Sequence, residues 1–162
     1  MLGRLFGNRE RASRRLAFEG RDFQLHLNGD WIEIPDSDPD RRNFTSEGKR
    51  TAIVISTTPV RLPRSRLLEA AERLAEARRN GEQAVPGRKV TFGENWVELK
   101  ADGELGHVAY AGYDDAGTIF RFMGWATEAK ILSLWVSTET NDNLFSKRVF
   151  DEVFAGFRFY VP

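Results

Sequence analysis

Side chains able to do acid–base or nucleophilic chemistry are scarce in this sequence. Its two histidines, His26 and His107, fall in stretches where apolar and polar residues alternate as in a strand. A serine nucleophile would need one of them beside a Gly-x-Ser-x-Gly turn, and the sequence has no such motif. Phosphate-binding glycine motifs and cysteines are missing too, which excludes disulfides and zinc–thiolate sites. We therefore expect both histidines on the less buried faces of their strands, and no cofactor.

Two acidic clusters remain as candidates for a metal or acid–base site. Asp36-x-Asp38-x-Asp40, with Glu47 at the twelfth position, is spaced like the oxygen ligands of a calcium loop. Arg41 occupies the position where such a loop needs glycine, so the pattern favours a solvated acidic loop and no metal. Asp114-Asp115 could act as paired carboxylates, but Asp-Asp-Ala-Gly is a typical turn sequence. An enzyme with an unrecognised carboxylate site stays open as an alternative.

Tryptophans in alternating strands are the strongest candidates for binding. The stretches 96–100, 118–126 and 130–138 each alternate an apolar face with a mixed face that carries a tryptophan. We expect the apolar faces to receive the helices and the mixed faces to line up. Aromatic, methionine and arginine side chains are typical of protein-binding hot spots, and such a surface can accept an apolar or amphipathic helix. The candidate binding residues are Trp96, Tyr113, Arg121, Met123, Trp125, Ile131 and Trp135. The alternative is that this second face is also core, covered by a helix or by the N-terminal segment.

The elements that must position these residues follow from periodicity and turn signals. The pattern predicts a β-hairpin over 23–34 around Asn28-Gly-Asp30, a buried strand over 50–58 and a helix over 64–80. An antiparallel meander over 89–138, a second helix over 144–155 and a last strand over 157–161 follow. The predicted fold class is α+β: an antiparallel sheet of about six or more strands flanked by helices, as an α/β/α sandwich. Residues 22–162 form the expected single domain.

Charge is unevenly distributed in this electrically neutral chain. Residues 1–21 carry six arginines against two glutamates, and we expect them to form a flexible N-terminal segment. Leu2, Leu5 and Phe6 could form one amphipathic turn, so peripheral membrane contact through residues 1–20 is an alternative. The stretch 94–152 carries eleven acidic residues against five basic ones, and a net basic domain, the usual mark of a nucleic-acid binder, is lacking. No apolar run is long enough to span a membrane and no signal-peptide pattern is present, so we expect a cytoplasmic protein.

The order of expected elements is similar to that of the PsbP/Mog-like superfamily. The matching features are Gly29-Asp-Trp31 after a first strand, the long helix 64–80, and the ending Phe150-Asp-Glu-Val-Phe-Ala-Gly-Phe-Arg-Phe159. The resemblance covers about residues 22–161. It implies a sheet flanked by helices that serves as a binding platform, with no catalytic residues shared across the group, which includes Eag-type chaperones of secreted effectors.

The functional expectation combines this resemblance with the candidate residues. We expect a non-enzymatic protein-binding module, an adaptor or a secretion-effector chaperone, that holds a protein segment on its sheet. One alternative is an immunity- or inhibitor-type protein that neutralises an effector, with its acidic C-terminal half meeting a basic partner.

Overall fold

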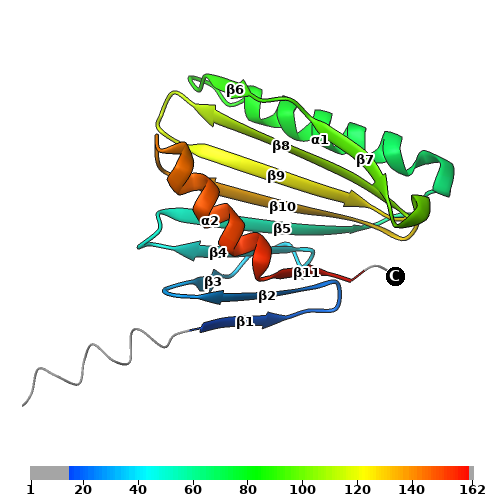
Figure 1. Cartoon of the computed structure of the whole chain (residues 1–162), viewed down its shortest axis with the longest axis horizontal. Coiled ribbons are helices and arrows are strands. Elements are labelled where there is room, and N and C mark those ends of the chain that lie inside the picture. The colour runs from blue at the N-terminus through cyan, green and yellow to red at the C-terminus, as the bar shows by residue number, and fades with distance from the viewer. Residues whose placement is uncertain (1–14, 161–162) are drawn as a thin grey trace, which may run out of the picture.

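A large antiparallel sheet forms the centre of the molecule. The computed structural model describes residues 15–160. The strand order in the large sheet is β3-β4-β5-β10-β9-β8-β6, and β7 pairs with β8 beside β6 (Figure 1). Its strands are β3 (Ile32–Ile34), β4 (Arg41–Ser46), β5 (Thr51–Pro59), β6 (Val90–Phe92), β7 (Trp96–Lys100), β8 (Leu105–Asp114), β9 (Ile119–Ala126) and β10 (Lys130–Thr138). Every pair of neighbouring strands is antiparallel, as the short connections of the meander predict.

A second, three-stranded sheet packs on one face of the first. It has the order β1-β2-β11 and consists of β1 (Arg15–Glu19), β2 (Phe23–Asn28) and β11 (Phe157–Phe159). Because β1 pairs with β2, the folded domain begins earlier than the expected boundary at residue 22. The predicted amphipathic turn of Leu2, Leu5 and Phe6 lies outside the described residues.

The hairpin predicted over 23–34 is wrong. β2 pairs with β1 and β11, whereas β3 pairs with β4 in the other sheet. Gly29 has a φ of +114°, and the Asp30 carboxylate accepts hydrogen bonds from the Ser46 hydroxyl and, at 2.7 Å, from the Gly48 backbone N–H. These bonds tie the Asn-Gly-Asp turn to the loop after β4, so the chain crosses between the sheets instead of folding back.

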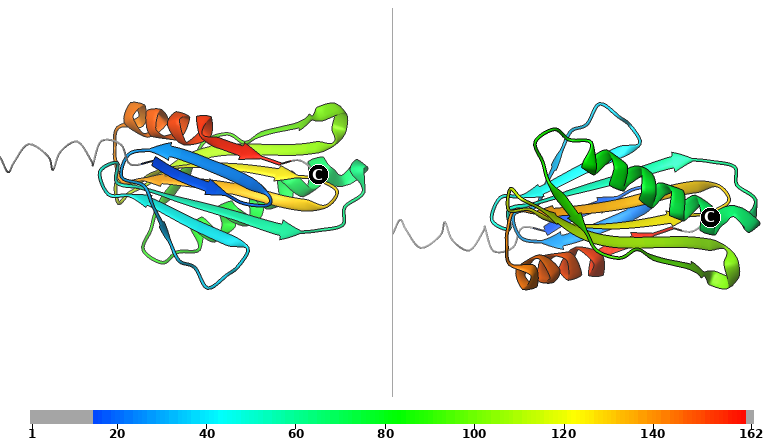
Figure 2. Two further views of the ribbon diagram at one scale, coloured as in Figure 1. Left: turned by 90° about the horizontal axis from the view of Figure 1, so that it is seen from below. Right: turned by 90° about the horizontal axis from the view of Figure 1, so that it is seen from above.

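Two helices lie on opposite faces of the large sheet. α1 (Leu67–Gln83) follows a short 3₁₀ turn, η2 (Arg64–Arg66), and packs on β6 to β9. α2 (Asn143–Ala155) lies on the other face beside the small sheet (Figure 2). Another 3₁₀ turn, η3 (Ala101–Gly103), joins β7 to β8. The predicted α+β class with helices flanking an antiparallel sheet is confirmed, and the small sheet shares a layer with α2.

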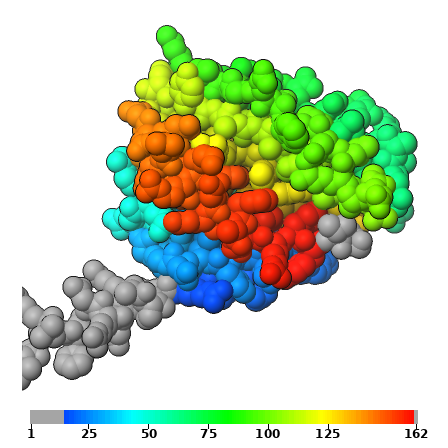
Figure 3. All heavy atoms as spheres, viewed as in Figure 1, coloured from blue at the N-terminus to red at the C-terminus, as the bar shows by residue number. Residues whose placement is uncertain are grey.

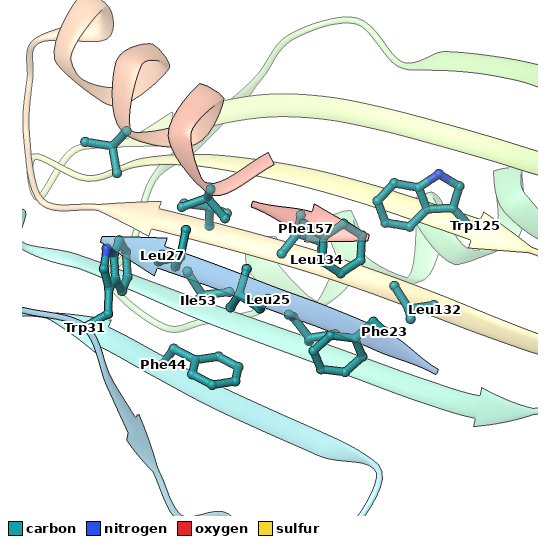
Figure 4. Packing of buried hydrophobic residues seen from close by; sticks show 14 of the residues in the cluster. Phe23, Leu25, Leu27, Trp31, Phe44, Ile53, Trp125, Leu132, Leu134 and Phe157 are labelled. Atoms are coloured by element: carbon teal, nitrogen blue, oxygen red, sulfur yellow. The ribbon is translucent and has the colours of Figure 1, made fainter. Parts of the chain in front are cut away.

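The interior has two hydrophobic clusters, one on each face of the large sheet. The larger one lies between the two sheets and includes Leu25, Phe44, Ile53, Leu134 and Phe157 (Figure 4). The smaller one lies under α1, where Ala71 and Ala75 face Val108, Phe122 and Trp135. Each fully buried Leu, Ile or Phe contributes roughly 1.5–3 kcal/mol relative to an exposed one.

Small residues let α1 approach the sheet closely. A Cβ added to Gly106 on β8 would lie 2.3 Å from the backbone oxygen of Leu67, so glycine is required there. The helix begins at Leu67, three residues later than predicted, because residues 64–66 form the 3₁₀ turn. It continues past Gly81, where nothing lies within 4 Å of an added Cβ, to Gln83. Neither α1 nor α2 is both long and apolar enough to cross a membrane.

Candidate functional site

The seven candidate binding residues do not share one face of the sheet. Five of them lie on the face that carries α2, because their strand partners place them there: Trp96, Tyr113, Arg121, Met123 and Trp125. Ile131 and Trp135 point to the opposite face, toward α1, and the expectation of a single Trp-bearing surface is wrong for these two.

The turn between β9 and β10 explains the split. Ala126 pairs with Ile131, so four residues separate the paired positions. An even number of intervening residues places odd-numbered residues of β9 opposite even-numbered residues of β10. Trp125 therefore pairs with Leu132, and Trp135 pairs with Phe122. The apolar face of β9 packs under α1, while that of β10 packs against the small sheet.

Two of the three candidate tryptophans belong to the core. Trp125 is 7% exposed and stacks on Phe157 of β11, with ring centroids 5.5 Å apart. Trp135 is 8% exposed and stacks on Phe120 at 4.8 Å, with the Arg78 guanidinium of α1 5.1 Å from its ring. Ile131 is half-buried at the start of β10. Any role of these three residues in binding stays a prediction.

Trp96 in contrast is 62% exposed and borders a groove. We call this hollow the α2–β7 groove, since it lies on the sheet face between α2 and β7. Its volume is about 270 Å³. Three candidate residues line it, Trp96, Arg121 and Met123, together with Ala109 and Ala111 of β8 and Phe150 of α2. In Figure 3, atoms of β8 and β9 (lime and yellow) remain visible between α2 (orange to red) and β6–β7 (green).

Small side chains on β8 leave space at the bottom of the groove. Ala109 lies opposite Met123, and Ala111 lies opposite Arg121, so each long side chain stands beside a methyl group. Ala111 also lines an adjoining hollow of about 560 Å³, where Tyr113, Ile119 and Asn143 lie. The two hollows together follow β8 along the edge of α2.

Arg121 is the positively charged group in the lining of the groove. Its Nη2 donates to Asn143 Oδ1 at 3.0 Å, and its guanidinium lies 5.8 Å from the centre of the Phe150 ring. Its Nε is buried and has no acceptor in the described part of the chain. Burial lowers the pKa of Arg121, although the nearby Asp151 carboxylate acts in the opposite direction. Within residues 15–160 no carboxylate oxygen lies within 4.0 Å of this guanidinium.

The N-terminus of α2 fixes Asn143 and thereby Arg121. Asp142 is the N-cap residue, and its Oδ1 accepts from the backbone N–H groups of Leu144 at 2.9 Å and Phe145 at 3.2 Å. Such caps hold the first turn of a helix, because its N–H groups have no intrahelical partners. α2 begins at Asn143, one residue before the start predicted from the sequence.

Asp114 has a structural role in the β8–β9 turn. Its Oδ1 accepts from the backbone N–H groups of Ala116 and Thr118, each at 3.0 Å, and its Oδ2 accepts from Arg88 Nε at 2.8 Å. Burial raises the pKa of Asp114, but these hydrogen bonds outweigh it and hold the pKa below its usual value. A group held as a carboxylate in this way suits turn formation better than proton transfer near neutral pH.

Asp36 likewise bonds within its own loop. It accepts from Arg41 Nε at 2.6 Å, from Asn43 Nδ2 at 2.5 Å and from the Asp38 backbone N–H at 2.8 Å. The Arg41 side chain lowers the pKa of Asp36. Among residues 15–160 no three His, Asp or Glu side chains form a group suited to a metal ion.

The two histidines differ in their surroundings. His107 is 4% exposed, so the expectation that it lies on a less buried face is wrong. Its Nδ1 lies 3.0 Å from the Gly124 oxygen, its ring stacks on Trp125 at 5.3 Å, and burial lowers its pKa. His26 is half-buried, with Nε2 2.5 Å from Glu19 Oε1 and Nδ1 3.3 Å from Arg15 Nη2. A polar hollow of about 730 Å³ lies beside it, lined by Lys49, Glu152 and Arg158 among others.

Sequence reasoning missed the contribution of α2 to the groove. Neither Phe150 nor Asn143 was among the candidate binding residues. The signal in the sequence was the pair of small residues Ala109 and Ala111, which are two apart in a strand and therefore leave space on one face of it.

Comparison with known proteins shows likeness in fold. No protein-family model matches this sequence, and no curated protein matches it either. The solution structure of cyanobacterial PsbP (CyanoP) from Synechocystis sp. PCC 6803 is similar, with a TM-score of 0.64 and 13% identity. That alignment covers 98% of this chain and 99% of CyanoP. The chain therefore has a PsbP-like fold.

Two further structures are more distant. A crystal structure of a protein from Bacteroides thetaiotaomicron has a TM-score of 0.45 and 12% identity, covering 92% of this chain and 49% of that one. LpqN of Mycobacterium tuberculosis, described as involved in cell envelope biogenesis, has a TM-score of 0.43 and 11% identity, covering 92% and 91%. Likeness at this level carries no argument about function.

Proposed function

We propose that this protein is a non-enzymatic binding module that holds an apolar or amphipathic segment of a partner protein in the α2–β7 groove. Its role would be that of an adaptor or a chaperone for a secreted effector, working in the cytoplasm. The observation that carries the proposal is the position of Trp96, a large aromatic side chain that remains 62% exposed at the border of an apolar groove.

The composition of the groove favours a protein ligand. Trp, Met and Arg are enriched at protein interfaces, and buried Trp and Arg residues are frequent hot spots. Trp96 and Met123 offer apolar area, Arg121 offers hydrogen-bond donors, and Phe150 forms the opposite wall. Burying the exposed part of the Trp96 side chain would contribute about 2–4 kcal/mol to binding.

The ionisable groups outside the groove support a non-catalytic role. Asp36, Asp114 and His107 each bond to groups of the same chain, in turns or in the core. A catalytic acid or base needs a proton within reach of a substrate and a pKa near the working pH. The PsbP-like fold is in keeping with the binding platform that we propose.

Co-purification with matched variants tests the proposal. The full chain is tagged and expressed in the cells that normally produce it, as wild type, Trp96→Ala and Leu99→Ala. Leu99 is the control because it is 50% exposed on the same strand but points to the other face of the sheet. We expect a specific partner to co-purify with wild type and Leu99→Ala and to be lost, by tenfold or more, with Trp96→Ala. A partner retained equally by all three proteins would contradict the proposal.

A further inference from the structure

The positive charge of Arg121 indicates which chemical group a segment bound in the groove presents to it. We propose that the segment held in the α2–β7 groove carries a carboxylate that binds the Arg121 guanidinium. This inference rests on the proposed function and specifies which segments the groove accepts. The carboxylate can come from an Asp or Glu side chain or from the C-terminus of the partner, since both present the same two oxygens.

Unused hydrogen-bond donors are the first argument. A guanidinium has five N–H donors, and Arg121 spends one contact on Asn143 Oδ1. Its Nε is buried without an acceptor in residues 15–160. A buried donor left unpaired is costly, so a shift of the Arg121 side chain that brings Nε to a ligand oxygen would remove that cost. Planar carboxylates match the two-pronged geometry of the guanidinium.

Missing charge neutralisation is the second argument. Asp151 of α2 is the acidic residue whose field acts on Arg121, but its carboxylate lies 3.4 Å from Lys147 Nζ instead. The Phe150 ring and the apolar floor around the guanidinium keep water from screening it fully. Within residues 15–160 the Arg121 guanidinium has no carboxylate partner, so a carboxylate of the ligand could form an ion pair with it.

The surroundings favour a single negative charge over a phosphate. Glu94 also lines the groove, so one carboxylate already stands in the lining beside the single arginine. A dianionic phosphate would be repelled more strongly by Glu94 than a carboxylate, which brings one charge and can lie flat on the guanidinium. Large apolar neighbours of that carboxylate would meet Trp96 and Met123.

Peptide selection on the whole protein tests the inference. Two libraries of short random peptides, one with free C-termini and one with blocked C-termini, are selected against wild type, Trp96→Ala, Arg121→Gln and Arg121→Lys. We expect peptides selected on wild type to combine a large apolar residue with an acid, and to bind Trp96→Ala poorly. Enrichment of Asp or Glu in both libraries would identify a side-chain carboxylate, and enrichment confined to free C-termini would identify a terminal one.

The selected peptides are then measured with the carboxylate replaced by the corresponding amide. For wild type we expect affinity to fall by about 10- to 100-fold, as for loss of a charge-assisted hydrogen bond. For Arg121→Gln the acid and amide peptides should bind equally, and for Arg121→Lys part of the preference should remain. The Arg121 Nε–H signal in NMR spectra should shift with the acid peptide.

The outcomes separate the two proposals. Peptides that need Trp96 but bind equally well as acid and amide would overturn the carboxylate inference and leave the proposed function intact. A selection in which no peptide prefers wild type over Trp96→Ala would overturn both.

Discussion

His107 is a buried polar residue with a hydrogen bond within the chain, and its burial has a consequence for pH. Its ring is enclosed between Gly124 and Trp125, and the charged side chains that act on it are Glu98 and Lys100. Burial lowers the pKa of His107 below its usual 6.5, because the protonated ring would lose its hydration.

The sign of the resulting pH effect follows from proton binding. Just below pH 6.5 the unfolded chain binds a proton at His107 and the folded chain does not, so the folded state loses stability as the pH falls. We predict that the free energy of unfolding decreases between pH 7.5 and about 5.5, with a slope of at most about 1.4 kcal/mol per pH unit from this residue. Urea unfolding at both pH values measures it.

The control for this prediction is His107→Gln, which removes the titrating ring but keeps a hydrogen-bonding group. The variant should be less stable at pH 7.5, and its stability should depend less on pH than that of wild type. The carboxyl groups with lowered pKa values, such as Asp30 and Asp114, change their contribution at more acidic pH. An identical fall in both proteins would show that His107 is not the cause.

At the scale of elements, α2 has two roles, because it covers part of the hydrophobic core and also forms one wall of the groove. Asp142 holds its first turn, and the next residue, Asn143, holds Arg121. Val149 and Val153 anchor the helix in the larger hydrophobic cluster, while Phe150 faces the groove. Loosening the first turn should therefore affect both stability and the position of the guanidinium.

The prediction is that Asp142→Ala lowers the free energy of unfolding by about 1 kcal/mol, the usual cost of losing an N-cap. Asp142→Asn is the matched variant, because asparagine caps as well as aspartate does and should leave stability within a few tenths of a kcal/mol. Urea unfolding followed by circular dichroism measures both. Equal losses in the two variants would mean that the negative charge, and not the cap, is what matters.

Elements with strong periodicity could be predicted from the sequence, and those defined by distant pairing could not. β8, β9, β10 and both helices lie where their patterns place them. β1 and β4 were missed, because an Arg-rich stretch and a polar loop give little strand signal and become strands through their neighbours. The hairpin over 23–34 failed because the bonds of Asp30 to Ser46 and Gly48 come from elsewhere in the chain.

The candidate site shows the same division. Alternation correctly separated the two faces within each strand, but the pairing register of β9 with β10 decides which faces join. That register depends on the four residues between Ala126 and Ile131, which the periodicity of the strands does not reveal. Trp96, Arg121 and Met123 were predicted as part of one surface and do come together, whereas Trp125 and Trp135 lie in different layers.

At the scale of the molecule, the groove exists because the covering layers are narrower than the sheet. α1 covers β6 to β9 on one face, and the small sheet covers β4, β5 and β10 on the other. α2 lies over part of the remaining width (Figure 2), and the part of that face around Trp96, Ala109 and Ala111 stays open. A partner segment lying there would complete the layer that α2 and the small sheet begin.

The most direct measurement of this account is photo-crosslinking from single positions in the cells that produce the protein. A photoreactive phenylalanine analogue replaces Trp96 in one protein and Leu99 in another, and mass spectrometry maps the peptides joined to each. We predict one partner segment joined to position 96, rich in apolar residues and containing a carboxylate, and no such product from position 99. A partner joined equally from both positions, or only from position 99, would contradict the assignment of the groove as the binding surface.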